Sequence, residues 1–145
     1  MRRALLAGLR FTLAIAAPVA AQDQVATVSF ERFQQLRWVV GSWKGAGGSF
    51  PAFYESYEVV DDSTLRRYSW TDSTFTKKQD SARFEWHAGR LAQVRNGRSF
   101  PAVRFTGDTV QWQAPGATWI RTSKDAWTAI LAGGGTVYHL VRYKR

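Results

Sequence analysis

Side chains that could do acid–base or metal chemistry are few and scattered. The chain has two histidines, His87 and His139, and no cysteine. Glu85 and His87 form an acid–histidine pair at two-residue spacing, but alternation with Phe84 and Trp86 predicts that both face water. A zinc site needs closely spaced ligands, and a common hydrolase type needs a Gly-x-Ser-x-Gly turn; the sequence has neither. We therefore expect neither an enzyme nor a metal site.

The stretch VVGSWKGAGG, residues 39–48, is the one segment that resembles a phosphate-binding loop. A P-loop places Lys after its second glycine, whereas Lys44 here precedes Gly45. A dinucleotide fingerprint needs a third glycine where Phe50 stands, followed by a helix, and a strand-like segment follows instead. Both nucleotide-binding interpretations fail, and the stretch is better explained as a glycine-rich first strand.

The elements that position these residues are one helix and a series of short strands. Apolar residues recur at helical spacing in SFERFQQLRWVVG, with Ser29 as N-cap, so we expect a helix from Phe30 to Trp38 that ends before Gly41. From Ser42 onward, aromatic and β-branched runs alternate with turn signals, of which RNGR is a strong hairpin signal. Such spacing is typical of an antiparallel meander.

About ten strands are expected, and one or two of the eleven candidate segments should merge or be irregular, with residues 74–79 the weakest. The segments are 42–47, 52–61, 64–71, 74–79, 81–88, 90–96, 100–107, 109–114, 117–123, 126–132 and 136–144. A meander of this length left open would expose two long edges, and closure removes both. The predicted fold class is therefore all-β: one antiparallel meander barrel with one short N-terminal helix.

The start of this barrel resembles the lipocalin and fatty-acid-binding superfamily. In that superfamily a short helical lead precedes a Gly-x-Trp in the first strand, matched here by Gly41 and Trp43. The resemblance implies that Trp43 seals one end of the barrel and that a late basic residue, Arg142, packs over it, as cation–π attraction would favour. The chain is most similar to small exported barrels of unassigned activity.

A second resemblance is to nitrobindin-like haem barrels. Their Gly-x-Trp-x-Gly-x-Gly start is matched by residues 41–47, and a histidine near the end of their chain ligates haem iron. This resemblance implies haem as the cofactor and His139 as its ligand. Strand alternation argues otherwise, because an inward Arg142 puts His139 on the outer face.

The first 21 residues have the pattern of a secretory signal peptide. Arg2 and Arg3 precede an apolar run, and APVAA ends the segment before Gln22. A membrane anchor is the rival interpretation, against which the run is short and contains Arg10. We expect cleavage, a flexible leader over residues 22–28 and a barrel domain over residues 29–145.

Export to the periplasm or outside the cell follows from such a segment. Its removal takes away three arginines and no acidic residue, which lowers the formal net charge from +9 to +6. The remaining basic residues are scattered rather than clustered, so we expect no nucleic-acid partner. Without the segment, we expect no integral membrane span.

The expected function is non-covalent binding of a small, mostly apolar molecule inside the barrel. Aromatic residues would form the wall, and Arg67 and Arg104 would supply inward cations. The residues predicted for the ligand site are Trp43, Tyr57, Arg67, Tyr68, Trp70, Trp86, Arg104, Trp112, Trp119 and Arg142. Two alternatives stay open: a haem or nitric-oxide binder through His139, and a barrel filled by its own aromatics that serves as a structural or interaction module.

Overall fold

In the computed structural model, which describes residues 24–144, a short helix precedes the barrel. Helix α1 (Phe30–Gln34) continues into the 3₁₀ turn η1 (Gln35–Val39). It begins where predicted, because the Ser29 hydroxyl accepts a hydrogen bond from the Arg32 N–H at 3.2 Å. The fully buried residues of the segment are Phe33, Leu36 and Val39. Their three-residue spacing turns one apolar face of the helix toward the barrel.

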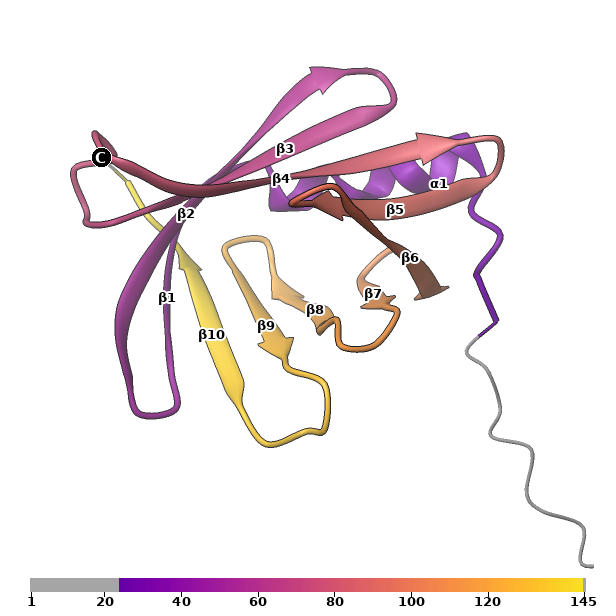
Figure 1. Ribbon diagram of the computed structural model, residues 1–145. Helices are drawn as coiled ribbons and strands as arrows, with labels where there is room; N and C mark the ends of the chain where they lie inside the picture. Colours follow the sequence, from indigo (N-terminus) through magenta and orange to yellow (C-terminus); the bar gives the residue numbers. More distant parts are fainter. Residues whose placement is uncertain (1–23, 145) are drawn as a thin grey trace, which may run out of the picture.

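Ten strands follow and close on themselves as one antiparallel meander (Figure 1). They are β1 (Gly41–Gly47), β2 (Phe50–Asp61), β3 (Thr64–Trp70), β4 (Lys78–His87), β5 (Arg90–Arg95), β6 (Arg98–Phe105), β7 (Thr109–Trp112), β8 (Thr118–Ser123), β9 (Ala126–Ile130) and β10 (Val137–Arg142). The first and last strands pair with each other, with Trp43 opposite Arg142. The predicted fold class is confirmed.

The turns explain where the strands break. Asn96 and Gly97 have φ values of 50° and 72°, so the RNGR segment makes the tight hairpin turn predicted for it. Residues 71–77 form a loop, and only the end of the weak segment 74–79 is extended, as the beginning of β4. The eleven candidate segments thus give ten strands.

The helix closes one end of the barrel and leaves the other end to loops. Gln34 donates a hydrogen bond to the Asp62 carbonyl in the β2–β3 turn, and Trp38 donates one to the Gly107 carbonyl between β6 and β7. The β4–β5 and β8–β9 turns lie at this same end, because neighbouring strands are antiparallel. The opposite end, here called the mouth, consists of the β1–β2, β3–β4, β5–β6, β7–β8 and β9–β10 turns.

The predicted leader over residues 22–28 is held against the barrel in its described part. The Ala26 and Val28 N–H groups each donate a 2.8 Å hydrogen bond, to the carbonyls of Ala102 and Gly89, and Val28 is fully buried. The part of the predicted leader that the structure describes, residues 24–28, is therefore packed on the barrel through Val28. The predicted signal peptide, residues 1–21, lies outside the described residues and stays a prediction. Within residues 24–144, no helix has the length and apolar composition needed to cross a bilayer.

Candidate functional site

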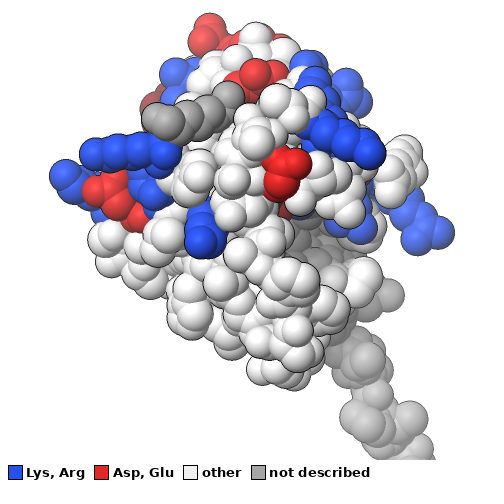
Figure 2. Space-filling view, turned by 90° about the vertical axis from the view of Figure 1, so that its left-hand side faces the viewer, with Lys and Arg blue, Asp and Glu red and all other residues white. Residues whose placement is uncertain are grey.

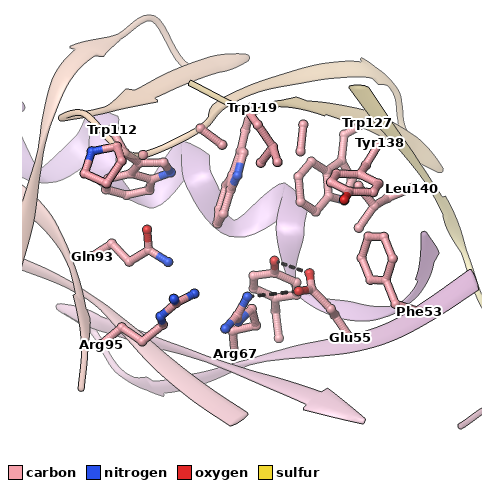
Figure 3. A pocket seen from close by; sticks show the side chains of 16 residues that line it. Phe53, Glu55, Arg67, Gln93, Arg95, Trp112, Trp119, Trp127, Tyr138 and Leu140 are labelled. Carbon is pink, nitrogen blue, oxygen red and sulfur yellow. Dashed lines mark hydrogen bonds and ion pairs between the residues drawn. The ribbon is translucent and has the colours of Figure 1, made fainter. Parts of the chain in front are cut away.

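A cavity of about 360 Å³ occupies the mouth half of the barrel interior. Figure 3 shows aromatic side chains along one side of it and polar side chains along the other. Its lining residues are Phe53, Glu55, Tyr57, Arg67, Gln93, Arg95, Trp112, Pro115, Gly116, Ala117, Trp119, Trp127, Ala129, Leu131, Tyr138 and Leu140. This volume lies at the lower end of the range for small-molecule sites.

The aromatic wall is built from three tryptophans on three consecutive strands. Trp112 lies on β7, Trp119 on β8 and Trp127 on β9. The ring centroids of Trp112 and Trp119 are 5.4 Å apart, and those of Trp119 and Trp127 are 5.0 Å apart. Their edge-on and tilted arrangement is the one that aromatic quadrupoles favour. Phe53 extends the wall onto β2 by lying over Gly45, where a Cβ atom would collide with its ring. The wall therefore depends on a glycine in the neighbouring strand.

The polar wall contains a buried ion network. Arg67 on β3 donates from Nη1 to Glu55 Oε1 and from Nη2 to Asp80 Oδ2, both at 3.0 Å. The Tyr57 hydroxyl donates to the other oxygen of Glu55 at 2.7 Å. Both terminal nitrogens of Arg67 are therefore occupied by carboxylates of the protein itself.

Burial and charge shift two titrating groups of this network. Burial raises the pKa of the Tyr57 phenol well above its ordinary value, and the nearby Glu55 charge raises it further. Burial alone would lower the pKa of Arg67, but the neighbouring Glu55, Tyr57 and Asp80 outweigh that effect and the pKa is raised. At neutral pH the phenol of this network is thus neutral and its guanidinium is charged.

Arg95 is a second cation on the polar side and is differently placed. It follows Gln93 by two residues on β5, so both side chains point inward, and it ends the strand at the mouth. Arg95 is exposed and forms no ion pair with any residue among 24–144. Its guanidinium is the lining cation available to a guest molecule.

Three buried N–H groups of lining residues lack an acceptor within the described residues. They belong to the Trp112 and Trp127 indoles and to Arg67 Nε. A buried donor without an acceptor costs free energy, so each such group calls for a partner. All three nitrogen atoms are buried, so they are not open to the cavity.

Trp43 and Arg142 meet at the helix end, as the lipocalin-like resemblance implies. The Arg142 guanidinium carbon lies 3.9 Å from the centroid of the Trp43 ring, and Trp43 donates a 2.6 Å hydrogen bond to the Val39 carbonyl. Neither residue lines the cavity. The structure therefore places both residues at the helix end, below the cavity, and not in its lining.

Four of the predicted ligand residues line the cavity, and four others lie outside it. Tyr57, Arg67, Trp112 and Trp119 are the lining four. The other four are Tyr68, Trp70, Trp86 and Arg104. Strand alternation or a position at the helix end keeps these four side chains out of the cavity lining.

Tyr68 and Trp70 lie on the outer face of β3, since Arg67, one residue before Tyr68, points inward and side chains alternate along a strand. Outside the barrel, Lys78 Nζ lies 3.9 Å from the Tyr68 ring centroid, and Trp70 donates to the Ser56 hydroxyl at 2.8 Å. Trp86 lies at the helix end, where it donates to the Val28 carbonyl. Arg104 is exposed, and its side chain is not part of the cavity lining.

His139 lies on the outer face of β10, as alternation with Arg142 predicts. It is exposed and its Nδ1 lies 3.3 Å from the Thr128 hydroxyl oxygen, while Tyr138 and Leu140 on either side line the cavity. The remaining histidine, His87, is also exposed. The proposed role of His139 as a ligand to haem inside the barrel is therefore wrong, because its side chain points away from the interior.

The lining residues that the sequence did not predict follow the same two-residue period as those that it did predict. Glu55 stands between Phe53 and Tyr57, and Trp127 precedes Ala129 and Leu131 at that spacing. The inward polar residues were missed because polar side chains on a strand normally face water. The signal for Trp127 was obscured by apolar residues on both faces of β9.

Among residues 24–144, no three His, Cys, Asp or Glu side chains gather as a metal site would require. No protein family, curated protein or solved structure matches this chain. The geometry of the cavity therefore carries the functional argument.

Proposed function

We propose that this barrel reversibly binds a small molecule with an aromatic or otherwise apolar body and one acidic group. The observation that carries the proposal is the two-sided cavity: tryptophans face a polar wall that ends in an unpaired arginine. Apolar area buried against the tryptophans supplies affinity, and the polar groups fix orientation. The closed meander, the lead helix and the Trp43–Arg142 contact support placing the chain among lipocalin-like barrels.

The acidic group is assigned to Arg95 and not to Arg67. Arg67 already holds Glu55 and Asp80, so an anion placed there would meet two carboxylates. Arg95 has no such competitor, and Gln93 beside it adds an amide donor. Tyr57 also lines the cavity, but its hydroxyl is engaged by Glu55.

The body of the ligand is limited by volume. A cavity of 360 Å³ holds the equivalent of about a dozen water molecules at roughly 30 Å³ each. One or two fused or linked rings fit this space, whereas a folded long-chain lipid would protrude at the mouth.

A pair of fluorescent probes tests this proposal. Anilinonaphthalene sulfonate and N-phenylnaphthylamine share one ring skeleton, and only the first carries an anion. We expect both to bind the native protein and Arg95→Gln to weaken the sulfonate about tenfold, as expected for loss of a charge-assisted hydrogen bond, with the neutral probe unchanged. Titration with fluorescence detection gives both affinities.

Arg98→Gln is the matched control, because Arg98 is an exposed arginine just across the β5–β6 turn and does not line the cavity. It should leave both affinities as they are. Equal weakening by Arg98→Gln would mean that overall positive charge attracts the sulfonate. Failure of both probes to bind would reject the cavity as a ligand site.

A further inference from the structure

The rim of the mouth differs sharply in charge from the rest of the barrel. Residues 45–54, 109–120 and 126–141 contain no Lys, Arg, Asp or Glu. They include the β1–β2, β7–β8 and β9–β10 turns, all of which lie at the mouth. In Figure 2 the lower part of the surface, where the β1–β2 and β9–β10 hairpins lie, is free of charged side chains, which gather in the upper part.

This uncharged rim carries exposed apolar side chains at its tips. Phe50, at the beginning of β2, is 63% exposed, and Leu131, just after β9, is 40% exposed. Pro51, Ala132 and Pro115 beside them are exposed as well. A single exposed apolar side chain is ordinary, whereas several exposed apolar residues within a surface without charge mark an interaction site.

The remaining turns of the mouth are basic. Lys77 in the β3–β4 loop and Arg95 and Arg98 beside the β5–β6 turn are exposed. None of the three has an ion pair with the described residues. Asp72 is the acidic residue of these two turns, so cations dominate this side. Apolar tips beside unpaired cations match a surface that is apolar inside and anionic outside.

We infer that the mouth docks on an anionic lipid bilayer, with the β1–β2 and β9–β10 tips in the headgroup layer and Lys77 and Arg98 against lipid phosphates. Tips of this kind gain from burial at the acyl boundary, and the cations gain from the negative surface potential. Docked in this way, the cavity opens toward the membrane. The inference rests on the proposed function in one respect only: the docked barrel would exchange its ligand with the bilayer.

Vesicle flotation tests the docking with the purified protein. The probe is phosphatidylcholine vesicles with about one quarter phosphatidylglycerol, compared with phosphatidylcholine alone. We expect the protein to float with the anionic vesicles and to lose about tenfold in partitioning when Phe50→Asp and Ala132→Asp are combined, because both tips then carry a charge. Lys77→Gln with Arg98→Gln should remove the preference for anionic lipid.

The matched control combines Val59→Asp with Val60→Asp. Both valines are 43% exposed and lie beside the β2–β3 turn, at the helix end. This variant has the same net charge as the tip variant and should float like the native protein. An equal loss of flotation in the two variants, or no flotation of the native protein, would overturn the inference. A native protein that forms a stable dimer in buffer and does not float would assign the rim to self-association instead.

Insertion of the β1–β2 tip into the bilayer and ligand binding in the cavity are measured by separate experiments. Because the chain has no cysteine, Ser49→Cys carries a single environment-sensitive fluorophore at the β1–β2 tip, and Thr122→Cys carries it at the end of β8 away from the mouth. Only the first should brighten and shift on anionic vesicles. The tip variant should bind both naphthalene probes normally without membranes, so failed docking and a failed ligand site give different results.

Discussion

At the residue scale, Tyr57 links the aromatic and polar sides of the cavity. Its ring stacks on Phe84 at a centroid distance of 6.0 Å and meets Trp119 edge-on at the same distance. Its hydroxyl donates to Glu55, which also accepts from Arg67. Because the phenol is buried beside a carboxylate, its neutral form is strongly favoured in the folded protein.

This environment predicts a pH dependence. A raised pKa in the folded state means that the unfolded chain releases the phenol proton first as pH rises. Titration of Tyr57 should therefore add no pH dependence to the free energy of unfolding below about pH 10, the ordinary tyrosine value, and should lower that free energy from there toward the higher folded pKa. Urea unfolding between about pH 9 and about pH 11 should show a shallower decline in Tyr57→Phe than in the native protein.

Tyr54→Phe serves as the reference for that experiment, since Tyr54 is a partly exposed tyrosine on the same strand. Its decline with pH should parallel that of the native protein. Parallel curves for all three proteins would show that Tyr57 does not govern alkaline stability.

At the scale of elements, the β3–β4 loop is pinned to the outside of the barrel by one side chain. Phe75 has a positive φ of 56° and is 6% exposed. Its ring packs on Tyr54, Trp70 and Tyr143, with centroids between 5.7 and 5.9 Å away. An unfavourable backbone conformation is here held in place by aromatic packing.

Phe75→Ser should release this loop without opening the barrel, because the loop lies outside the closed sheet. We expect trypsin to cut after Lys77 or Lys78 about tenfold faster, as local opening of an unpinned loop becomes easier. Limited proteolysis with mass spectrometry measures the rate and the site. Phe50→Ser is the control, because it removes a phenylalanine that is 63% exposed and should not change the cleavage rate. Faster cleavage after Lys77 or Lys78 in this control would indicate a general loss of stability.

At the scale of the whole molecule, Arg142 joins the first strand, the last strand and the helical segment. Its Nη1 donates to the Val40 carbonyl at 2.6 Å and its Nη2 to the Lys124 carbonyl at 3.3 Å, while the guanidinium covers Trp43. Gly41 permits this contact, because a Cβ atom there would collide with the guanidinium and its φ of 124° suits glycine. Closure of the barrel and capping by the helix segment thus share one side chain.

Arg142→Met keeps the apolar stem and removes the guanidinium. It should lower the free energy of unfolding by about 2–4 kcal/mol, since a partly buried carbonyl loses its charged donor and the indole loses its cation. Urea denaturation measures the change. Arg104→Met, a control at an exposed arginine, should lower the free energy of unfolding by less than about 0.5 kcal/mol. An equal decrease for both variants would mean that Arg142 has no special role in closing the barrel.

The Trp43–Arg142 contact was implied only by the family resemblance, whereas local patterns in the sequence determined the helix with its Ser29 cap, the RNGR turn and the ten-strand meander. Each depends on residues close in sequence, or on one apolar face that must be buried, so periodicity and turn chemistry were enough. Alternation of Val110 and Trp112 with Gln111 also predicted the buried side of β7 and with it the position of Trp112.

Tertiary structure alone decided the rest of the cavity. Glu55 and Arg67 are tolerated inside because they meet each other across paired strands, and no local pattern shows such compensation. Tyr68 and Trp70 look like wall residues in the sequence, yet the inward Arg67 forces them outside. The division between the filled helix end and the open mouth likewise depends on which side chains meet across the barrel, and that is fixed only when the sheet closes.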